Sequence, residues 1–172
     1  MTRDEWLAAD DAKLLAACRV EKRAAGGPGG QKRNKTAAEV RLLHQPTGIT
    51  AQAGDDRSPK VNLGHAVRQL RLKIAVSERV AVDLGELERP WFWSEYVRNG
   101  RVQMNAKNPL FPAAVASVLD MLDATGGDPS VAATNIGVSL RSLLRLLRGD
   151  AIAWRAADDV RRKWSLPLLT PP

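Results

Sequence analysis

A short glycine-rich stretch holds the residue types best suited to chemistry in this sequence. Four glycines and one proline fall within residues 26–30. This composition excludes the interior of a helix or strand, because glycine loses the most freedom on ordering and proline lacks a backbone donor. With no Cβ at Gly29 and Gly30, the backbone N–H groups can approach a ligand closely. Gln31 ends the loop with a side chain that both donates and accepts hydrogen bonds.

Cationic side chains flank the glycines on both sides. Residues 22–36 hold five of them and no acidic side chain: Lys22, Arg23, Lys32, Arg33 and Lys35. This charge favours a polyanionic ligand, as does the formal net charge of +7 on the whole chain. The alternative is a flexible surface turn with solvated lysines. A phosphate-binding P-loop is excluded, because no G-x-x-x-x-G-K-[ST] frame fits the stretch.

The rest of the chain is poor in catalytic side chains. His44 and His65 have no carboxylate or cysteine at metal-ligand spacing, so we expect both to be structural and predict no metal site. Cys18, the single cysteine, is expected to be a small buried apolar side chain. No Ser-His-Asp or Cys-His set is found and no cofactor is predicted.

The sequence predicts a cytoplasmic protein with no membrane segment. No apolar run approaches the length of about 18 residues that a membrane span needs. The acidic start, Met1–Trp6, is neither a secretory signal nor a transit peptide. A single cysteine fits a reducing compartment.

The first part of the chain has the pattern of a small α+β sandwich. Residues 4–16 are predicted to form one short helix, with Thr2 and Glu5 at capping-box spacing. Alternating residues indicate strands near 18–20 and over 40–44, and a further strand after the turn at Pro46 completes a hairpin. The expected fold is a small, mostly antiparallel sheet packed on one long helix.

That long helix begins after a clear start signal. Ser58 is expected to cap it, with Pro59 in the first helical position. Four apolar residues at helical spacing predict its buried stripe: Leu63, Val67, Leu70 and Ile74. Arg68 and Arg71 lie off this stripe and are predicted to contact phosphate groups. A merely solvated helix face is the alternative.

The last part of the chain is predicted to be a small all-α module resembling a helix-turn-helix. Helices are expected over 112–124 and 151–164, and between them two helices join through Gly137 and the cap Ser139. Arg141 and Arg145, with Arg148, form a row along the second of these helices and are predicted to contact phosphates. A three-helix bundle that binds no nucleic acid has the same pattern. Trp154 and Trp164 are expected in the core.

The full string around the glycines carries a family resemblance. Gly-Pro-Gly-Gly-Gln followed by Asn34-Lys35-Thr36 resembles the signature of class I peptide chain release factors and of the related stand-alone peptidyl-tRNA hydrolases that rescue stalled ribosomes. The similarity covers about residues 12–78. It implies a release-factor-type GGQ catalytic domain over 1–90, followed by an aromatic hinge and linker over 91–111 and the helical module over 112–172.

The resemblance also implies a chemistry. Gly29 and Gly30 would admit the backbone to the peptidyl-transferase centre, and the N–H of Gln31 would stabilise charge on the reacting ester. The Gln31 side chain would position the attacking water, while ribosomal RNA and the tRNA terminus would supply the remaining catalytic groups. Lys32, Arg33 and Lys35, with Lys22 and Arg23 before the loop, would steady it on RNA phosphates.

The leading hypothesis is therefore codon-independent, ribosome-dependent hydrolysis of the peptidyl-tRNA ester by a monomer. The expected partners are the ribosome, through ribosomal RNA at its peptidyl-transferase centre, and peptidyl-tRNA, with further RNA contact through the helical module. Codon independence is inferred because the sequence has neither the Pro-any-Thr nor the Ser-Pro-Phe string of decoding release factors. Two alternatives stay open: a non-enzymatic ribosome- or RNA-binding paralogue, and a helix-turn-helix protein that binds DNA.

Overall fold

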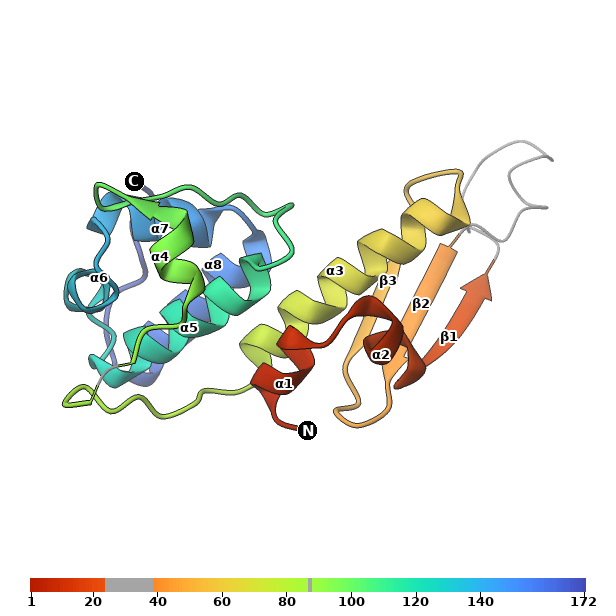
Figure 1. The fold of residues 1–172 in the computed structure, drawn as a ribbon, viewed down its shortest axis with the longest axis horizontal. Coiled ribbons are helices and arrows are strands. Elements are labelled where there is room, and N and C mark those ends of the chain that lie inside the picture. The colour runs from red at the N-terminus through yellow and green to blue at the C-terminus, as the bar shows by residue number, and fades with distance from the viewer. Residues whose placement is uncertain (24–38, 87) are drawn as a thin grey trace. The chain divides into compact units, whose positions relative to one another are not determined.

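The chain forms two compact units, Met1–Ile74 and Ala75–Pro172. The computed structural model describes residues 1–23, 39–86 and 88–172. Within these residues there are eight helices, one three-stranded sheet and one two-stranded sheet (Figure 1). This confirms the α+β prediction. None of the described helices is both long and apolar enough to cross a bilayer.

Unit 1 contains the three-stranded sheet and a long helix. Its elements are, in chain order, α1 (Arg3–Ala8), α2 (Asp11–Ala16), β1 (Cys18–Arg23), β2 (Glu39–His44), β3 (Thr50–Ala53) and α3 (Pro59–Ser77), whose last turn belongs to unit 2. The strands are antiparallel in the order β1-β2-β3. Leu42 in the central strand stands opposite Val20 on one side and Ala51 on the other.

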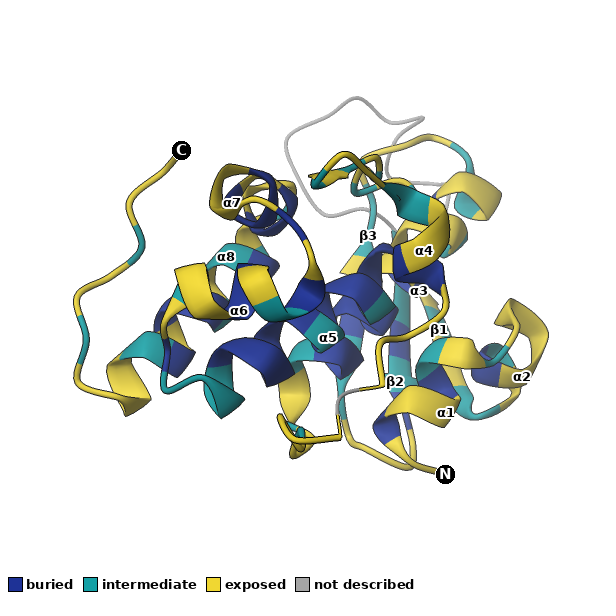
Figure 2. Ribbon diagram, turned by 60° about the vertical axis from the view of Figure 1, so that its left-hand side comes forward, coloured by how far each residue is buried: buried dark blue, intermediate teal, exposed yellow. Residues whose placement is uncertain are grey.

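The core of unit 1 lies between this sheet and α3. Alternation along β2 buries Val40, Leu42 and His44 completely. The predicted stripe of α3 faces them: Val67, Leu70 and Ile74 are buried, and Leu63 is half-buried against the same cluster. Figure 2 shows the buried residues of β2 and α3 in dark blue. The stripe and the strands are thus confirmed.

The prediction of one helix over residues 4–16 is wrong. The structure has two helices, because Ala9 is extended and Asp10 starts a second helix by accepting a hydrogen bond from the N–H of Lys13. The capping box at the first helix is confirmed, with the Thr2 hydroxyl accepting from the Glu5 N–H and the Glu5 carboxylate from the Thr2 N–H. The break lets α1 and α2 pack separately.

Unit 2 is mainly helical. Its elements are α4 (Phe92–Tyr96), β4 (Val97–Arg98), β5 (Arg101–Val102), α5 (Phe111–Ala124), α6 (Pro129–Ile136), α7 (Leu140–Arg148) and α8 (Ala151–Lys163). The predicted helix-turn-helix is present as α6 and α7. Asp128 caps α6 ahead of Pro129, Gly137 ends it at φ +86°, and Ser139 caps α7. Only glycine adopts that φ without strain, so Gly137 makes the turn possible.

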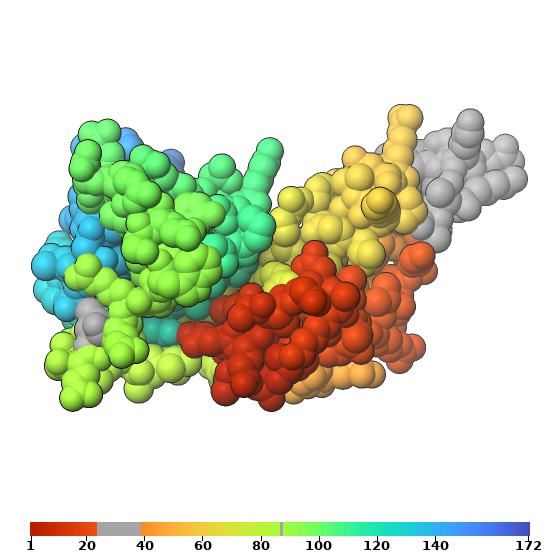
Figure 3. Space-filling model, viewed as in Figure 1, coloured from red at the N-terminus to blue at the C-terminus, as the bar shows by residue number. Residues whose placement is uncertain are grey.

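The stretch 91–111 is more than a linker. It holds α4 and the β4–β5 hairpin and forms part of the surface of unit 2 (green in Figure 3). Trp93 is buried and its Nε1–H donates to the Ser117 hydroxyl at 3.1 Å, whereas Trp91 is exposed. The units divide after Ile74, earlier than the boundary expected at residue 90. The three-part functional division stays a prediction.

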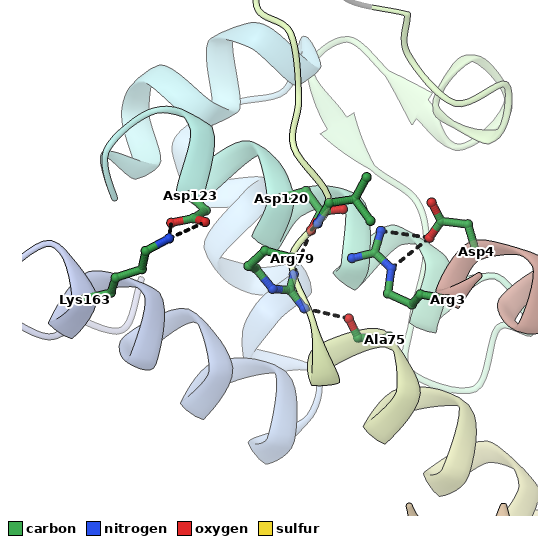
Figure 4. A network of polar contacts seen from close by, with 8 residues as sticks. Arg3, Asp4, Ala75, Arg79, Asp120, Asp123 and Lys163 are labelled. Atoms are coloured by element: carbon green, nitrogen blue, oxygen red, sulfur yellow. Dashed lines mark hydrogen bonds and ion pairs between the residues drawn. The ribbon is translucent and has the colours of Figure 1, made fainter. Parts of the chain in front are cut away.

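Two carboxylates of α5 connect it to other segments of unit 2 (Figure 4). Asp120 accepts from the Arg79 guanidinium at 3.0 Å and from the Val80 N–H at 3.1 Å. Asp123 accepts from Lys163 at 2.7 Å and from the Trp164 indole at 2.9 Å. Trp164 is 47% exposed, so the prediction that it is a core residue is wrong: it lies over the rim of the unit with its N–H on Asp123.

Candidate functional site

The site predicted from the glycine-rich string is bracketed by paired strands. β1 ends at Arg23 and β2 begins at Glu39, and these two residues are opposite partners in the ladder. Gly29, Gly30, Gln31, Lys32, Arg33 and Lys35 lie outside the described residues. Their assignment as catalytic and RNA-binding residues stays a prediction, whereas the ends of their segment are held side by side (Figure 1).

Lys22 and Arg23, the two cations of β1 that are predicted to bind RNA, differ in their ion pairs within the described residues. Arg23 donates to the Glu21 carboxylate at 2.8 Å, and Glu21 also lies 3.4 Å from the Arg19 guanidinium. Lys22 points to the other face of the sheet, opposite Val40, and its ammonium group has no ion pair or hydrogen bond within the described part of the chain. Both side chains are exposed. Lys22 is therefore the cation of β1 best placed to bind an anion.

The beginning of α3 lies beside the beginning of β2. Gly54, between β3 and α3, approaches Glu39 closely: a Cβ added at Gly54 would stand 3.2 Å from the Glu39 side chain, which would have to shift to make room. Buried Asn62 holds the turn before the helix: its amide donates to the Asp56 carbonyl at 2.8 Å and accepts from the Asp56 N–H at 3.1 Å. Asn62 was missed in the sequence, although a polar residue on the apolar side of the helix start was a usable signal.

The two arginines predicted on α3 have different roles. Arg68 is exposed and available to a partner. Arg71 is only 9% exposed, and its guanidinium donates to the carbonyls of Trp6, Leu7 and Ala9 and to the Asp11 carboxylate. This corrects the expectation that Arg71 contacts RNA phosphates, because its donors are used to hold α1 and α2.

His44 and Cys18 of unit 1 pack in or against its core. His44 is fully buried, stacks edge-on against Trp6 with centroids 4.5 Å apart, and lies 2.7 Å from the Thr47 hydroxyl through Nδ1. Burial lowers the pKa of His44 below its ordinary value. Burial raises the pKa of the half-buried Cys18 thiol, which donates to the Leu14 carbonyl. Over the described ranges, no three His, Cys, Asp or Glu side chains group as metal ligands.

The arginine row of unit 2 lies on the outer face of α7. Arg141, Arg145 and Arg148 are exposed, while Leu143 and Leu147 on the opposite face are fully buried. The structure therefore places Arg141 and Arg145, which are predicted to contact phosphates, on an accessible surface. Sequence reasoning missed Arg98 and Arg101 of the neighbouring hairpin. The signal was available, because the sequence has no acidic residue between Glu95 and Asp120.

Comparison with known proteins concerns unit 1 and the residues just after it. The family model described as the RF-1 domain matches residues 15–88. Peptide chain release factor 1 of Symbiobacterium thermophilum is 46% identical over 57 residues, which are 33% of this chain and 16% of that protein. Peptide chain release factor 2 of Haemophilus influenzae is 43% identical over 56 residues, 33% of this chain and 15% of that protein.

A longer match is to peptide chain release factor 1 of Variovorax paradoxus, 44% identical over 68 residues, which are 38% of this chain and 19% of that protein. Residues 15–88 therefore match the RF-1 domain, and the relatives that align with this chain are peptide chain release factors 1 and 2. The chain spans less than a fifth of the length of these curated relatives. The helices α4–α8 lie beyond the matched residues.

Proposed function

We propose that this protein hydrolyses the peptidyl-tRNA ester in the ribosome without reading a codon. The observation that carries the proposal is the RF-1 domain match over 15–88, which includes an intact Gly29-Gly30-Gln31. Release is the activity named by the relatives, which are peptide chain release factors. This chain would share the release step, and its partners would be ribosomal RNA and peptidyl-tRNA.

The described part of unit 1 supports this role as a scaffold. The β1–β2 ladder continues to Arg23 and Glu39, so the segment between them leaves and enters one end of a hydrogen-bonded sheet. The other edge of the sheet is covered, since Gln69 accepts from the Gln52 N–H and Lys73 donates to the Thr50 carbonyl. A hydrogen-bonded base of this kind fixes the two points from which the segment extends, which favours its precise placement against an ester.

The proposed chemistry asks for few protein groups. Hydrolysis of an ester passes through a tetrahedral intermediate whose oxygen carries negative charge, and a backbone N–H aimed at that oxygen lowers the barrier. The Gln31 N–H would be this donor, and its side chain would hold the attacking water. The water adds to the carbonyl carbon, the bond to the tRNA ribose oxygen breaks, and that oxygen takes up a proton.

Codon independence is supported by the strings that the sequence lacks. Neither Pro-any-Thr nor Ser-Pro-Phe occurs, and the one Ser-Pro pair, Ser58-Pro59, starts α3 instead. The Ser58 N–H donates to the Asp56 carboxylate, so this pair has a structural role.

The test is release of formyl-methionine from initiator tRNA on ribosomes, with and without a stop codon in the decoding site. We expect equal release in both cases. Gln31→Ala should slow release by about 10²–10³-fold, the usual effect of losing one group that stabilises an oxyanion. Gln45→Ala is the matched control, because Gln45 is an exposed turn residue whose backbone N–H alone bonds, to the Ala17 carbonyl.

Two results would count against the proposal. No release by the wild-type protein on any ribosomal complex would remove the hydrolase activity. Release that requires a stop codon would leave the hydrolysis and remove codon independence.

A further inference from the structure

The β4–β5 hairpin is built onto the helix-turn-helix of unit 2. The Ser139 N–H donates to the Gly100 carbonyl at 2.8 Å, and the Val102 N–H donates to the Ser142 hydroxyl at 2.7 Å. Gly100 and Val102 flank Arg101, while Ser139 and Ser142 flank Arg141. β5, which carries Arg101, therefore packs against the first turn of α7, which carries Arg141.

Five exposed arginines occupy these two elements, and we call them the basic face of unit 2: Arg98, Arg101, Arg141, Arg145 and Arg148. Within the described residues none of the five has an ion pair with a carboxylate, and Arg98 donates only to the carbonyls of Ser94 and Val97. Arg98 and Arg101 are direct cross-strand partners. Like charges in that position repel, and a bound anion would relieve this repulsion.

The basic and acidic side chains of unit 2 are distributed unevenly along the chain. Residues 75–172 contain twelve basic and eleven acidic side chains, close to neutrality. Yet residues 96–119 and 129–149, which include the hairpin, α6 and α7, hold six basic side chains and no acidic one. The acidic side chains of α5 are used internally, Asp120 with Arg79 and Asp123 with Lys163. The face is positive because no acid is built into it.

We propose that the basic face binds the phosphate backbone of double-helical RNA without reading its sequence. On α7 the three arginines follow at intervals of four and three residues, so they span about 10 Å along one side of the helix. The three arginines of this row can contact successive phosphates along a strand. Arg98 and Arg101 extend the basic face at the beginning of the helix. The hydrolase role of unit 1 is not needed for this binding.

Two features favour an RNA backbone over a DNA sequence. Leu140, 39% exposed, is the one exposed residue of α7 besides its arginines, so the helix lacks the Asn or Gln that pairs with adenine, and its base contacts in a major groove would be limited to arginine with guanine. The hairpin also stands beside the first turn of α7, the turn that a DNA-reading helix inserts into the groove. Double-stranded RNA is recognised through its backbone and shape, which arginines suffice to bind.

The test measures binding of the full-length protein to a labelled RNA duplex of about 16 base pairs, by fluorescence anisotropy at several salt concentrations. We expect affinity independent of RNA sequence and a steep fall with salt between about 50 and 200 mM. The double variants Arg141→Ala with Arg145→Ala, and Arg98→Ala with Arg101→Ala, should each weaken binding about tenfold or more and reduce the salt slope by about two. Arg155→Ala, an exposed arginine of α8 outside the face, is the matched control.

Each remaining outcome overturns the proposal. Binding unchanged in both double variants but lost in Lys32→Ala with Lys35→Ala would assign RNA binding to unit 1. Preference of more than about tenfold for one duplex DNA sequence would instead make α7 a DNA-reading helix. Circular dichroism of each variant shows that it is folded, and the duplex-binding readout distinguishes this proposal from a failure of hydrolysis.

Discussion

The backbone N–H of Val102 donates to the side-chain hydroxyl of Ser142 at 2.7 Å, which links the β4–β5 hairpin to the first turn of α7. Ser142 is 9% exposed and faces inward, away from Arg141. The Ser142 hydroxyl is therefore one of two groups that hold the hairpin against the first turn of α7. The basic face is continuous across the hairpin and α7 because of this bond and the hydrogen bond from the Ser139 N–H to the Gly100 carbonyl.

Ser142→Ala should lower the free energy of unfolding by about 1–3 kcal/mol, because it leaves the Val102 N–H without its acceptor. Amide hydrogen exchange should show faster exchange at Val102. Ser130→Ala is the control, since Ser130 is exposed and uses only its backbone groups. Equal protection of Val102 in the variant and the wild type would contradict the assigned role.

Arg71→Gln should destabilise unit 1 by about 2–4 kcal/mol, because three carbonyls and the Asp11 carboxylate lose a buried charged donor. Arg71→Lys should not restore the loss, since one ammonium group cannot match a planar guanidinium with five donors. Urea unfolding, followed by NMR through the amide resonances of α1 and α2, measures the stability of both variants. Arg68→Gln, at an exposed position, should change stability by less than about 0.5 kcal/mol.

His44 should make unit 1 less stable at acid pH. Its folded pKa lies below the ordinary value of 6.5 because of burial, so the unfolded chain binds the proton more readily. Stability is complete above the ordinary pKa and decreases as pH falls through it, by at most about 1.4 kcal/mol per pH unit.

Unfolding measured from about pH 7.5 to 5.5 tests this. His44→Gln should remove that slope, whereas His65→Gln, an exposed histidine, should keep it. A slope that is the same in all three proteins would assign the pH dependence to other groups.

Asp123→Ala should loosen the contact between α5 and the end of α8. Burial by itself acts to raise the pKa of Asp123, but the hydrogen bonds from Lys163 and Trp164, with the charges of Lys163 and Arg79, outweigh it and hold the pKa below its ordinary value. The carboxylate therefore stabilises unit 2 above its ordinary pKa, and this contribution is lost as pH falls through the lower folded pKa.

We expect a loss of about 1 kcal/mol at neutral pH, modest because Lys163 is largely exposed. Trp164 fluorescence should report the change. Asp159→Ala removes an exposed carboxylate paired with Arg162 on the same helix and should have little effect. A larger loss from Asp159→Ala than from Asp123→Ala would refute this account.

Local patterns predicted most of the elements correctly. The capping box at Thr2, the start of α3 at Ser58-Pro59 and the turn at Gly137 are each decided by residues within a few positions, so short-range chemistry suffices. The buried stripe of α3 could also be predicted from the sequence, because helical spacing alone shows which side of the helix is apolar. One error, at Trp164, depends on a distant partner, Asp123, whereas the helix expected over residues 4–16 is divided by a local cap at Asp10.

The sequence by itself determined the α+β class, the helix-turn-helix and the glycine-rich string, since composition, period and motif are local properties of the chain. Only the tertiary structure decided which arginines are free. Arg68 and Arg71 are three positions apart on one helix, yet Arg71 is enclosed by carbonyls from α1 and the residues after it, and Arg68 faces solvent. Arg101 and Arg141 are forty positions apart, and two hydrogen bonds bring the elements that carry them into contact. A side chain's partners come from the packing of distant segments, which no spacing in the chain records.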